Sequence, residues 1–310
     1  MKKFAAVFPG QGSQSVGMFA DFIGNGIVRQ TFDESSEALG FDIKKLCLEG
    51  PESELNRTEI TQPAILTASV AACRVLRSRG AEPMAVAGHS LGEYSALVAA
   101  GVLSFTDAVK LVHLRGRAMQ EAVPAGQGAM AAVLGLEDQA VIEACARVSA
   151  EGDAVWAANF NTPGQVVISG ARAACERACA ELAALGAKKV VPLAVSAPSH
   201  CPLMAPAAAR LAQALGELQV NDARVPVYVN SRAEPLTGAA DLTAALIAQL
   251  TGPVRWVETV RRLKADGAEV LIEVGPNRVL SGMNRRIDRS LGAGNVCDEA
   301  SLEKTLEILA

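Results

Sequence analysis

The chain has 310 residues, half of them hydrophobic and a fifth charged, so it can bury a sizeable core as one large domain or two smaller ones. Its net charge of −4 argues against a general nucleic-acid-binding protein. Because the 7 cysteines form no Cys-x-x-Cys pair, and no apolar stretch suits a signal peptide or a membrane-spanning helix, we expect a cytoplasmic protein with reduced thiols that is not bound to a membrane.

The first part of the chain alternates strands with helices. A strand is expected at residues 4–8, followed by a loop at 9–14 and a helix near 28–40. Thr61 is expected to cap a long helix at 62–79, which tolerates a proline in its first turn. Such alternation is typical of a parallel sheet covered by helices.

The most informative stretch is residues 88–92, Gly-His-Ser-Leu-Gly, which follow the apolar run 84–87. A strand that meets Gly-x-Ser-x-Gly and turns into a helix is a nucleophile elbow, a turn too tight for side chains at the glycine positions. The turn would hold Ser90 at its tip in a strained backbone conformation, with the hydroxyl free. The helix at 91–100 would point its N-terminus at the same place, where its N–H groups favour developing negative charge. The alternative is an ordinary Gly-Ser turn that matches a short pattern.

The helix expected at 105–122 opens with the capping box of Ser104 and Asp107 and carries an arginine on its apolar face. Periodicity places Arg115 in the middle of that apolar stripe, where a charge is costly unless it is paired. Two interpretations stay open. The guanidinium forms an internal ion pair with a protein carboxylate, or it waits for a substrate carboxylate, which it can bind with two hydrogen bonds.

The pattern changes after residue 125. The order of elements becomes strand–helix–strand–strand–helix–strand, which is the split βαβ arrangement of ferredoxin-like domains. We therefore predict a small ferredoxin-like subdomain at 126–196, inserted into a large subdomain formed by 1–125 and 197–310. The elements expected in the small subdomain are a strand at 129–135, a helix at 137–150, strands at 154–159 and 165–169, a helix at 171–186 and a strand at 188–195.

The remaining chain returns to the large subdomain. Together with the elbow, these elements predict an α/β protein whose core is an α/β-hydrolase-like parallel sheet. They are a strand at 225–229, a helix at 240–250, a helix at 254–266, a strand at 269–274 and helices at 278–288 and 299–309.

A serine hydroxyl needs a base, and the chain has 3 histidines. His89 adjoins the serine, so its side chain should leave on the opposite side, behind the elbow. His113 falls on the polar face of its helix and is expected to be solvated. His200 remains, in a loop stiffened by two prolines, and is the predicted base.

No acidic residue stands out as a third member of a triad. In α/β-hydrolases the acid lies between serine and histidine in chain order. Asp107, Asp138 and Asp153 lie there, but at helix starts or in a surface turn. We therefore favour a Ser-His dyad whose histidine is oriented by a neutral acceptor.

Several motifs occur in an order that resembles the malonyl-CoA:acyl carrier protein transacylases, within the acyltransferase family of fatty acid and polyketide synthesis. The resemblance runs nearly end to end. The motifs are 8–14 (Phe-Pro-Gly-Gln-Gly-Ser-Gln), 61–64 (Thr-Gln-Pro-Ala), 88–94 (Gly-His-Ser-Leu-Gly-Glu-Tyr), 114–116 (Leu-Arg-Gly), 159–165 (Asn-Phe-Asn-Thr-Pro-Gly-Gln), 198–200 (Pro-Ser-His) and 273–276 (Glu-Val-Gly-Pro).

The resemblance implies roles for seven residues. Ser90 would be the acylated nucleophile and His200 its base, while Arg115 is similar to the arginine that binds the malonyl carboxylate. The remaining roles are the backbone N–H groups of Gln11 and Leu91 as the oxyanion hole, Gln249 as the glutamine whose neighbourhood orients the histidine, and Asn161 as a residue lining the pocket.

One position departs from part of the family. Many polyketide acyltransferases for malonyl carry a bulky residue just before the histidine, where this chain has Ser199. Stand-alone fatty-acid enzymes of the family also have serine there. On steric grounds Ser199 leaves room for a methyl branch, so strict rejection of methylmalonyl is not expected.

The implied activity is transfer of a malonyl group from malonyl-CoA to the phosphopantetheine thiol of acyl carrier protein in fatty acid biosynthesis. We expect a monomer without metal or cofactor, since CoA and phosphopantetheine enter as parts of the substrates. The alternatives are a serine esterase or thioesterase, a trans-acting acyltransferase of a polyketide pathway, and a non-catalytic carrier-protein scaffold. Residues 188–189 and 285–286 are candidate docking charges for the carrier protein, or ordinary solvated surface.

Overall fold

The computed structural model describes residues 1–193 and 197–310, and a six-stranded sheet forms the centre of its larger part. The sheet order is β10-β9-β1-β2-β7-β8; neighbouring strands from β10 to β7 run parallel, and the edge strand β8 is antiparallel to β7. The strands are β1 (Phe4–Phe8), β2 (Ala85–Gly88), β7 (Val227–Val229), β8 (Glu234–Leu236), β9 (Val270–Val274) and β10 (Gly292–Val296).

Helices cover both faces of this sheet, as a parallel sheet requires. Alternate residues of β1 therefore enter different clusters: Phe4, Ala6 and Phe8 join the largest core, and Ala5 and Val7 pack on the other face. The helices are α1 (Gly26–Leu39), α2 (Ile43–Glu49), α3 (Glu52–Leu55), α4 (Thr58–Ser78), α5 (Gly92–Ala100), α6 (Phe105–Ala122), α9 (Ala205–Gly216), α10 (Ala239–Gln249), α11 (Trp256–Ala265), α12 (Val279–Ile287) and α13 (Glu299–Leu309).

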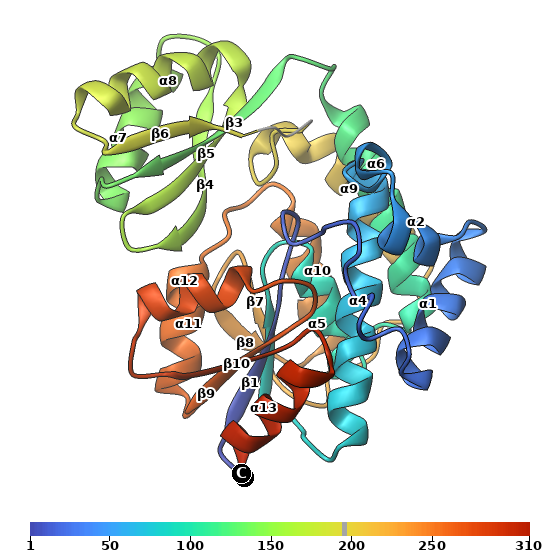
Figure 1. The fold of residues 1–310 in the computed structure, drawn as a ribbon. Helices are drawn as coiled ribbons and strands as arrows, with labels where there is room; N and C mark the ends of the chain where they lie inside the picture. The colour runs from blue at the N-terminus through green and yellow to red at the C-terminus, as the bar shows by residue number, and fades with distance from the viewer. Residues whose placement is uncertain (194–196) are drawn as a thin grey trace.

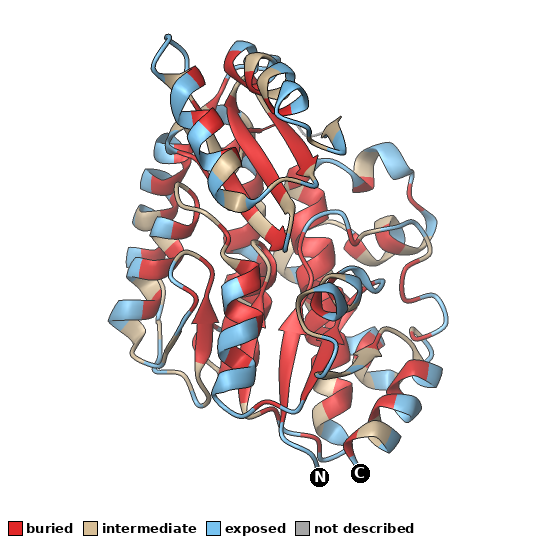
Figure 2. Ribbon diagram, turned by 90° about the vertical axis from the view of Figure 1, so that its left-hand side faces the viewer, coloured by how far each residue is buried: buried red, intermediate tan, exposed pale blue. Residues whose placement is uncertain are grey.

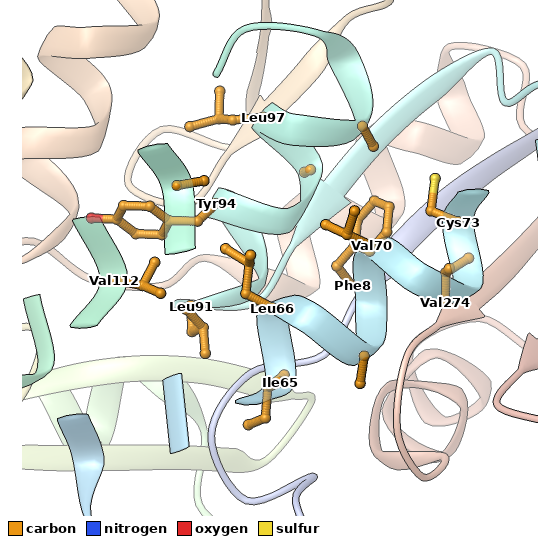
Figure 3. Packing of buried hydrophobic residues seen from close by; sticks show 14 of the residues in the cluster. Phe8, Ile65, Leu66, Val70, Cys73, Leu91, Tyr94, Leu97, Val112 and Val274 are labelled. Atoms are coloured by element: carbon orange, nitrogen blue, oxygen red, sulfur yellow. The ribbon is translucent and has the colours of Figure 1, made fainter. Parts of the chain in front are cut away.

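Helix α4 is buried on almost every side because its sequence is apolar or small nearly all round. Figure 3 shows Ile65, Leu66 and Val70 of this helix packed beside Phe8 of β1 and Leu91 at the start of α5. Burying a side chain of this size typically contributes about 1.5–3 kcal/mol. This cluster gives the strand–turn–helix around residue 90 a rigid support.

A second, four-stranded sheet lies above the first in Figure 1 and is antiparallel throughout. Its order β4-β5-β3-β6 is that of a ferredoxin-like βαββαβ unit, so the predicted fold class is confirmed. Its elements are β3 (Gly128–Leu134), α7 (Asp138–Ser149), β4 (Val155–Thr162), β5 (Gln165–Ala171), α8 (Arg172–Ala184) and β6 (Lys189–Pro192). The boundaries 126 and 196 stay predictions; the end of the predicted strand 188–195 lies partly outside the described residues, as does the boundary at 196.

Both helices of this unit pack on one face of its sheet, around Val133, Val141, Ile168 and Leu182. Figure 2 shows the pattern for the whole molecule: strands are mostly buried, and helices expose their outer faces. No helix within residues 1–193 and 197–310 combines the length and the apolar character needed to cross a membrane.

One local expectation was wrong, and several elements were not expected. Thr61 does not cap its helix: α4 begins at Thr58, and the Thr61 hydroxyl donates to the carbonyls of Leu55 and Arg57 at 2.6 and 3.1 Å. The short strands β8 and β10 and the helices α2, α3 and α9 were not expected. In β10, Gly292 and Gly294 pack so closely on β9 that a Cβ on Gly294 would lie 2.7 Å from Ile272 Cδ1.

Candidate active site

Residues 88–92 form the predicted tight turn between β2 and α5. A Cβ on Gly88 would lie 1.9 Å from the backbone of Gly92, and one on Gly92 would lie 2.0 Å from the Phe8 carbonyl oxygen. Ser90 itself has φ 51, in the left-handed region that side chains disfavour. The strain holds the hydroxyl at the tip of the turn, next to the first residues of α5.

His200 meets this hydroxyl from a segment 110 residues away in the chain. Its Nε2 lies 2.7 Å from Ser90 Oγ, and its Nδ1 donates to the Gln249 backbone carbonyl at 3.0 Å. The acceptor is thus a neutral carbonyl at the end of α10, as favoured in the absence of a triad acid. Burial, followed by the charge of Arg115, lowers the pKa of His200 to about 3.

The low pKa predicts a neutral imidazole throughout the range in which free histidine titrates. The pKa of His200 in the folded protein lies below the ordinary value of 6.5. Its contribution to the free energy of unfolding is therefore fully present above pH 6.5 and is lost as the pH falls towards 3. Ring ¹H–¹⁵N spectra of His200, assigned with a His200→Gln variant, should keep the neutral pattern between about pH 8 and pH 5. A titration midpoint near the ordinary value would contradict this.

Arg115 is buried on α6 and reaches the same hydroxyl. Its Nη2 donates to Ser90 Oγ at 3.3 Å and to Gln249 Oε1 at 3.1 Å, and its Nη1 donates to Gln62 Oε1 at 2.8 Å. The guanidinium carbon lies 5.3 Å from the Tyr94 ring centroid. Among the residues described, Arg115 forms no ion pair, so the internal-pair interpretation of its apolar position is not supported.

These groups open into a cavity between the two sheets, with about 940 Å³ of empty space continuous with solvent. Met130 and Val167 of the small sheet form part of its wall, and Val279 and Met283 of α12 another part. Gln11, Leu91, Asn161 and Ser199 also line the cavity, as do Ser90, Arg115 and His200. All the predicted site residues except Gln249 therefore face one space, and Gln249 lies directly behind it.

Two histidines lie differently from expectation. His89 does not lie behind the elbow: it lines the cavity, its Nε2 is 2.8 Å from Asn161 Oδ1, and its ring packs against Trp256 at 5.7 Å. The alternation of side chains along a strand does not continue into the sharp turn, so the His89 side chain points elsewhere than that alternation predicts. His113 is half-buried rather than solvated, because its Nδ1 contacts the Glu59 carbonyl at 2.8 Å and its ring packs on Phe41.

Sequence reasoning missed the residue that holds the turn. Asn230, fully buried after β7, accepts the Ser90 N–H through Oδ1 at 2.7 Å and donates through Nδ2 to the Gly88 carbonyl at 2.6 Å. Its own N–H donates to Glu93 Oε2 at 2.7 Å. A lone Asn between a strand and a turn gives no local signal for such a contact across 140 residues.

No metal centre emerges from the described part of the chain, where no three His, Cys, Asp or Glu side chains gather to hold an ion. The site is instead a serine–histidine pair beside a buried cation, which defines a nucleophilic serine enzyme. The comparisons with known proteins agree. Residues 6–301 match the acyl transferase domain family, and the chain belongs to that family.

Relatives match over their whole length. A malonyl CoA-acyl carrier protein transacylase of Haemophilus influenzae is 53% identical over 312 residues, which span 100% of both chains. The crystal structure of an acyl carrier protein S-malonyltransferase from Vibrio cholerae superposes with a TM-score of 0.96 at 52% identity, covering 98% of this chain and 100% of that one. A malonyl-transacylase solved in complex with a type II polyketide acyl-carrier protein superposes with a TM-score of 0.97 at 50% identity. The match covers 99% of this chain and 100% of that chain.

Proposed function

We propose that this protein transfers the malonyl group of malonyl-CoA to the phosphopantetheine thiol of acyl carrier protein, in fatty acid biosynthesis, as a cytoplasmic monomer. The observation that carries the proposal is the 3.3 Å contact between the buried Arg115 Nη2 and Ser90 Oγ. A short diacid esterified to the serine places its free carboxylate within reach of this cation. Guanidinium binds carboxylate with two charge-assisted hydrogen bonds.

In the first half-reaction, His200 Nε2 takes the Ser90 proton while the oxygen attacks the thioester carbonyl. The C–S bond then breaks, the proton passes to the leaving CoA sulfur, and a malonyl ester remains on the serine. We assign the backbone N–H groups of Gln11 and Leu91 to the oxyanion. One such donor typically contributes about 3–4 kcal/mol.

The second half-reaction is the same chemistry in reverse. The phosphopantetheine thiol gives its proton to His200 and attacks the ester, and the proton returns to Ser90 as the new thioester leaves. Because the two thioesters are alike, the exchange is close to balanced and follows a ping-pong scheme. Asn161, held by His89, is assigned to the wall of the acyl pocket.

A thioesterase would use the same serine with water as acceptor. The buried cation without an ion-pair partner argues for transfer, because a carboxylate bound to Arg115 would hold the ester in a fixed position for attack by the carrier-protein thiol. Mixing malonyl-CoA with the enzyme, with and without holo carrier protein, tests this. We expect malonyl-carrier protein to form much faster than free malonate, and dominant hydrolysis would contradict the proposal.

The same chemistry serves fatty acid and polyketide pathways. A competition between a fatty-acid carrier protein and a polyketide carrier protein distinguishes the two roles. The fatty-acid role predicts a higher kcat/KM for the fatty-acid carrier protein. Ser199 lines the cavity without bulk, and this supports some use of methylmalonyl-CoA as donor. A panel of CoA esters measures that selectivity.

Exposed cations follow the residues of α12 that line the cavity, and we assign them to carrier-protein docking. Helix α12 lines the cavity with Val279 and Met283, and one turn further Arg286 shares a second hollow with Lys188. Neither of these two cations forms an ion pair with a residue in the described ranges. Acyl carrier proteins are typically acidic, so the charges are complementary.

Reversing the charge of Arg285 and Arg286 together, each to Glu, should raise KM for carrier protein by about 10-fold and weaken its dependence on salt. Formation of the malonyl-enzyme from malonyl-CoA should be unchanged. Lys304→Glu, a single charge reversal on α13 away from the small sheet (Figure 1), is the control; it changes the net charge by half as much as the double variant. An unchanged KM in the double variant would contradict this docking surface.

A further inference from the structure

Two glutamines hold Arg115 from different sides. Gln62 lies on α4 and Gln249 ends α10, and both are fully buried. Their Oε1 atoms accept from Nη1 and Nη2 of the guanidinium at 2.8 and 3.1 Å. Both acceptors are neutral amides, although a carboxylate of the same shape would bind a buried guanidinium more strongly.

No carboxylate in the described chain neutralises this cation. The acid in its buried surroundings, Glu93, accepts the N–H of Asn230 through Oε2 at 2.7 Å rather than pairing with the guanidinium. Burial raises the pKa of Glu93 to about 7, against the opposing effects of Asn230, Gln249 and Arg115. The guanidinium is thus oriented by hydrogen bonds, and its charge stays available to a ligand.

We propose that Gln62 is a specificity-determining residue: its neutral amide oxygen holds Arg115 towards Ser90 without cancelling its charge, so that the site selects acyl groups that end in a carboxylate. The inference rests on the proposed malonyl transfer. It explains why an amide side chain occupies a fully buried position of α4, which the motif Thr-Gln-Pro-Ala left unexplained.

Gln62 is also the position at which the charge can be changed alone. Besides Arg115, its side chain contacts Met119 Sδ, at 3.5 Å from Nε2. Gln249, in contrast, donates to the Ser90 carbonyl at 2.9 Å, and its backbone carbonyl holds His200. A substitution at Gln249 would therefore disturb nucleophile and cation together.

The experiment compares Gln62→Glu with Gln62→Met. The first keeps the shape and adds one negative charge beside Arg115; the second has similar length, no charge and no strong acceptor. Acylation of each enzyme by malonyl-CoA and by acetyl-CoA is followed in single turnover, with quenched samples analysed by intact-protein mass. The ratio of the two kcat/KM values is the readout, because a merely structural defect would lower both.

We expect Gln62→Glu to lower kcat/KM for malonyl-CoA by on the order of 100-fold, since its carboxylate takes the place of the substrate's on Arg115. Acetyl-CoA should change by less than about 3-fold, because it has no carboxylate to lose. Gln62→Met keeps the cation but removes one of the two amides that hold it, so the preference for malonyl over acetyl should fall by about 10-fold without disappearing.

An equal loss for both acyl groups in Gln62→Glu would overturn the inference, as would a Gln62→Met enzyme with the wild-type ratio of malonyl to acetyl kcat/KM, because the amide would then not be needed to hold Arg115. Should Gln62→Glu not fold, as judged by thermal unfolding, the Gln62→Met preference decides by itself. Wild-type enzyme that does not transfer malonyl would instead contradict the proposed function. The two failures are therefore distinguishable.

Discussion

Replacing Ser90 with alanine abolishes the malonyl-enzyme. The variant keeps the cavity and Arg115, but it lacks the oxygen that forms the ester, so malonyl-CoA binds without reacting. Because removal of a nucleophilic serine costs roughly six orders of magnitude in kcat where it has been measured in a serine hydrolase, we expect malonyl transfer to fall by at least about 10⁴-fold. Intact-protein mass after mixing with malonyl-CoA detects the adduct directly.

Ser95→Ala is the matched control for that experiment. Ser95 lies on the same helix, α5, is fully buried, and its hydroxyl has no hydrogen-bond partner among the described residues. Its removal should leave the adduct intact. A covalent malonyl group on Ser90→Ala would refute the assignment of the nucleophile.

Replacing Arg115 with alanine should change which acyl group is transferred. The cation is the partner proposed for the malonyl carboxylate, and a carboxylate buried without a partner is costly. We expect kcat/KM for malonyl-CoA to fall by roughly 10²–10³-fold, while acetyl-CoA loses far less. For Arg115→Lys, kcat/KM for malonyl-CoA should lie between the values of the wild type and of the alanine variant. Lysine keeps the charge but cannot donate two parallel hydrogen bonds to a carboxylate.

Parallel kinetics with malonyl-CoA and acetyl-CoA measure this preference, and thermal unfolding reports on folding. Equal transfer of both acyl groups, at wild-type rates, would mean that the arginine is only structural. An equal loss of both would point to a general defect of the site. Only the selective loss of malonyl agrees with carboxylate recognition.

The parts of the site that could be predicted from sequence are those with a local signature. The glycines at 88 and 92 mark the elbow because a side chain at either position would overlap backbone. Arg115 stands out because helical periodicity places its charge on an apolar face. His200 was found by elimination, which works in a chain with 3 histidines.

The supports of the site could not be predicted, because their contacts are long-range. Gln62 meets Arg115 across 53 residues, and Asn230 meets Ser90 across 140. Each is a single amide whose role depends on the packing of α4 and on the end of β7. Gln62 is a buried polar residue in a largely apolar helix, but the buried Thr61, Thr67 and Ser69 of the same helix show that this feature alone does not single it out.

In the fold, most long and periodic elements were predicted, but the 12-residue helix α9 was missed together with the short strands β8 and β10. Strand β10, with two glycines in five residues, has Val296 as its single β-branched side chain and so gives a weak strand signal. It forms because those glycines allow close pairing with β9, which no local pattern shows. His89 was misplaced for a related reason, since strand alternation fails at a strained turn.

The most direct test of the account is a crystal structure of the enzyme trapped after reaction with malonyl-CoA in the absence of carrier protein. We predict an ester on Ser90 Oγ, with the free carboxylate bound by both terminal nitrogens of Arg115. An acyl group on another residue, or a carboxylate directed towards solvent while Arg115 keeps only its glutamine partners, would contradict it.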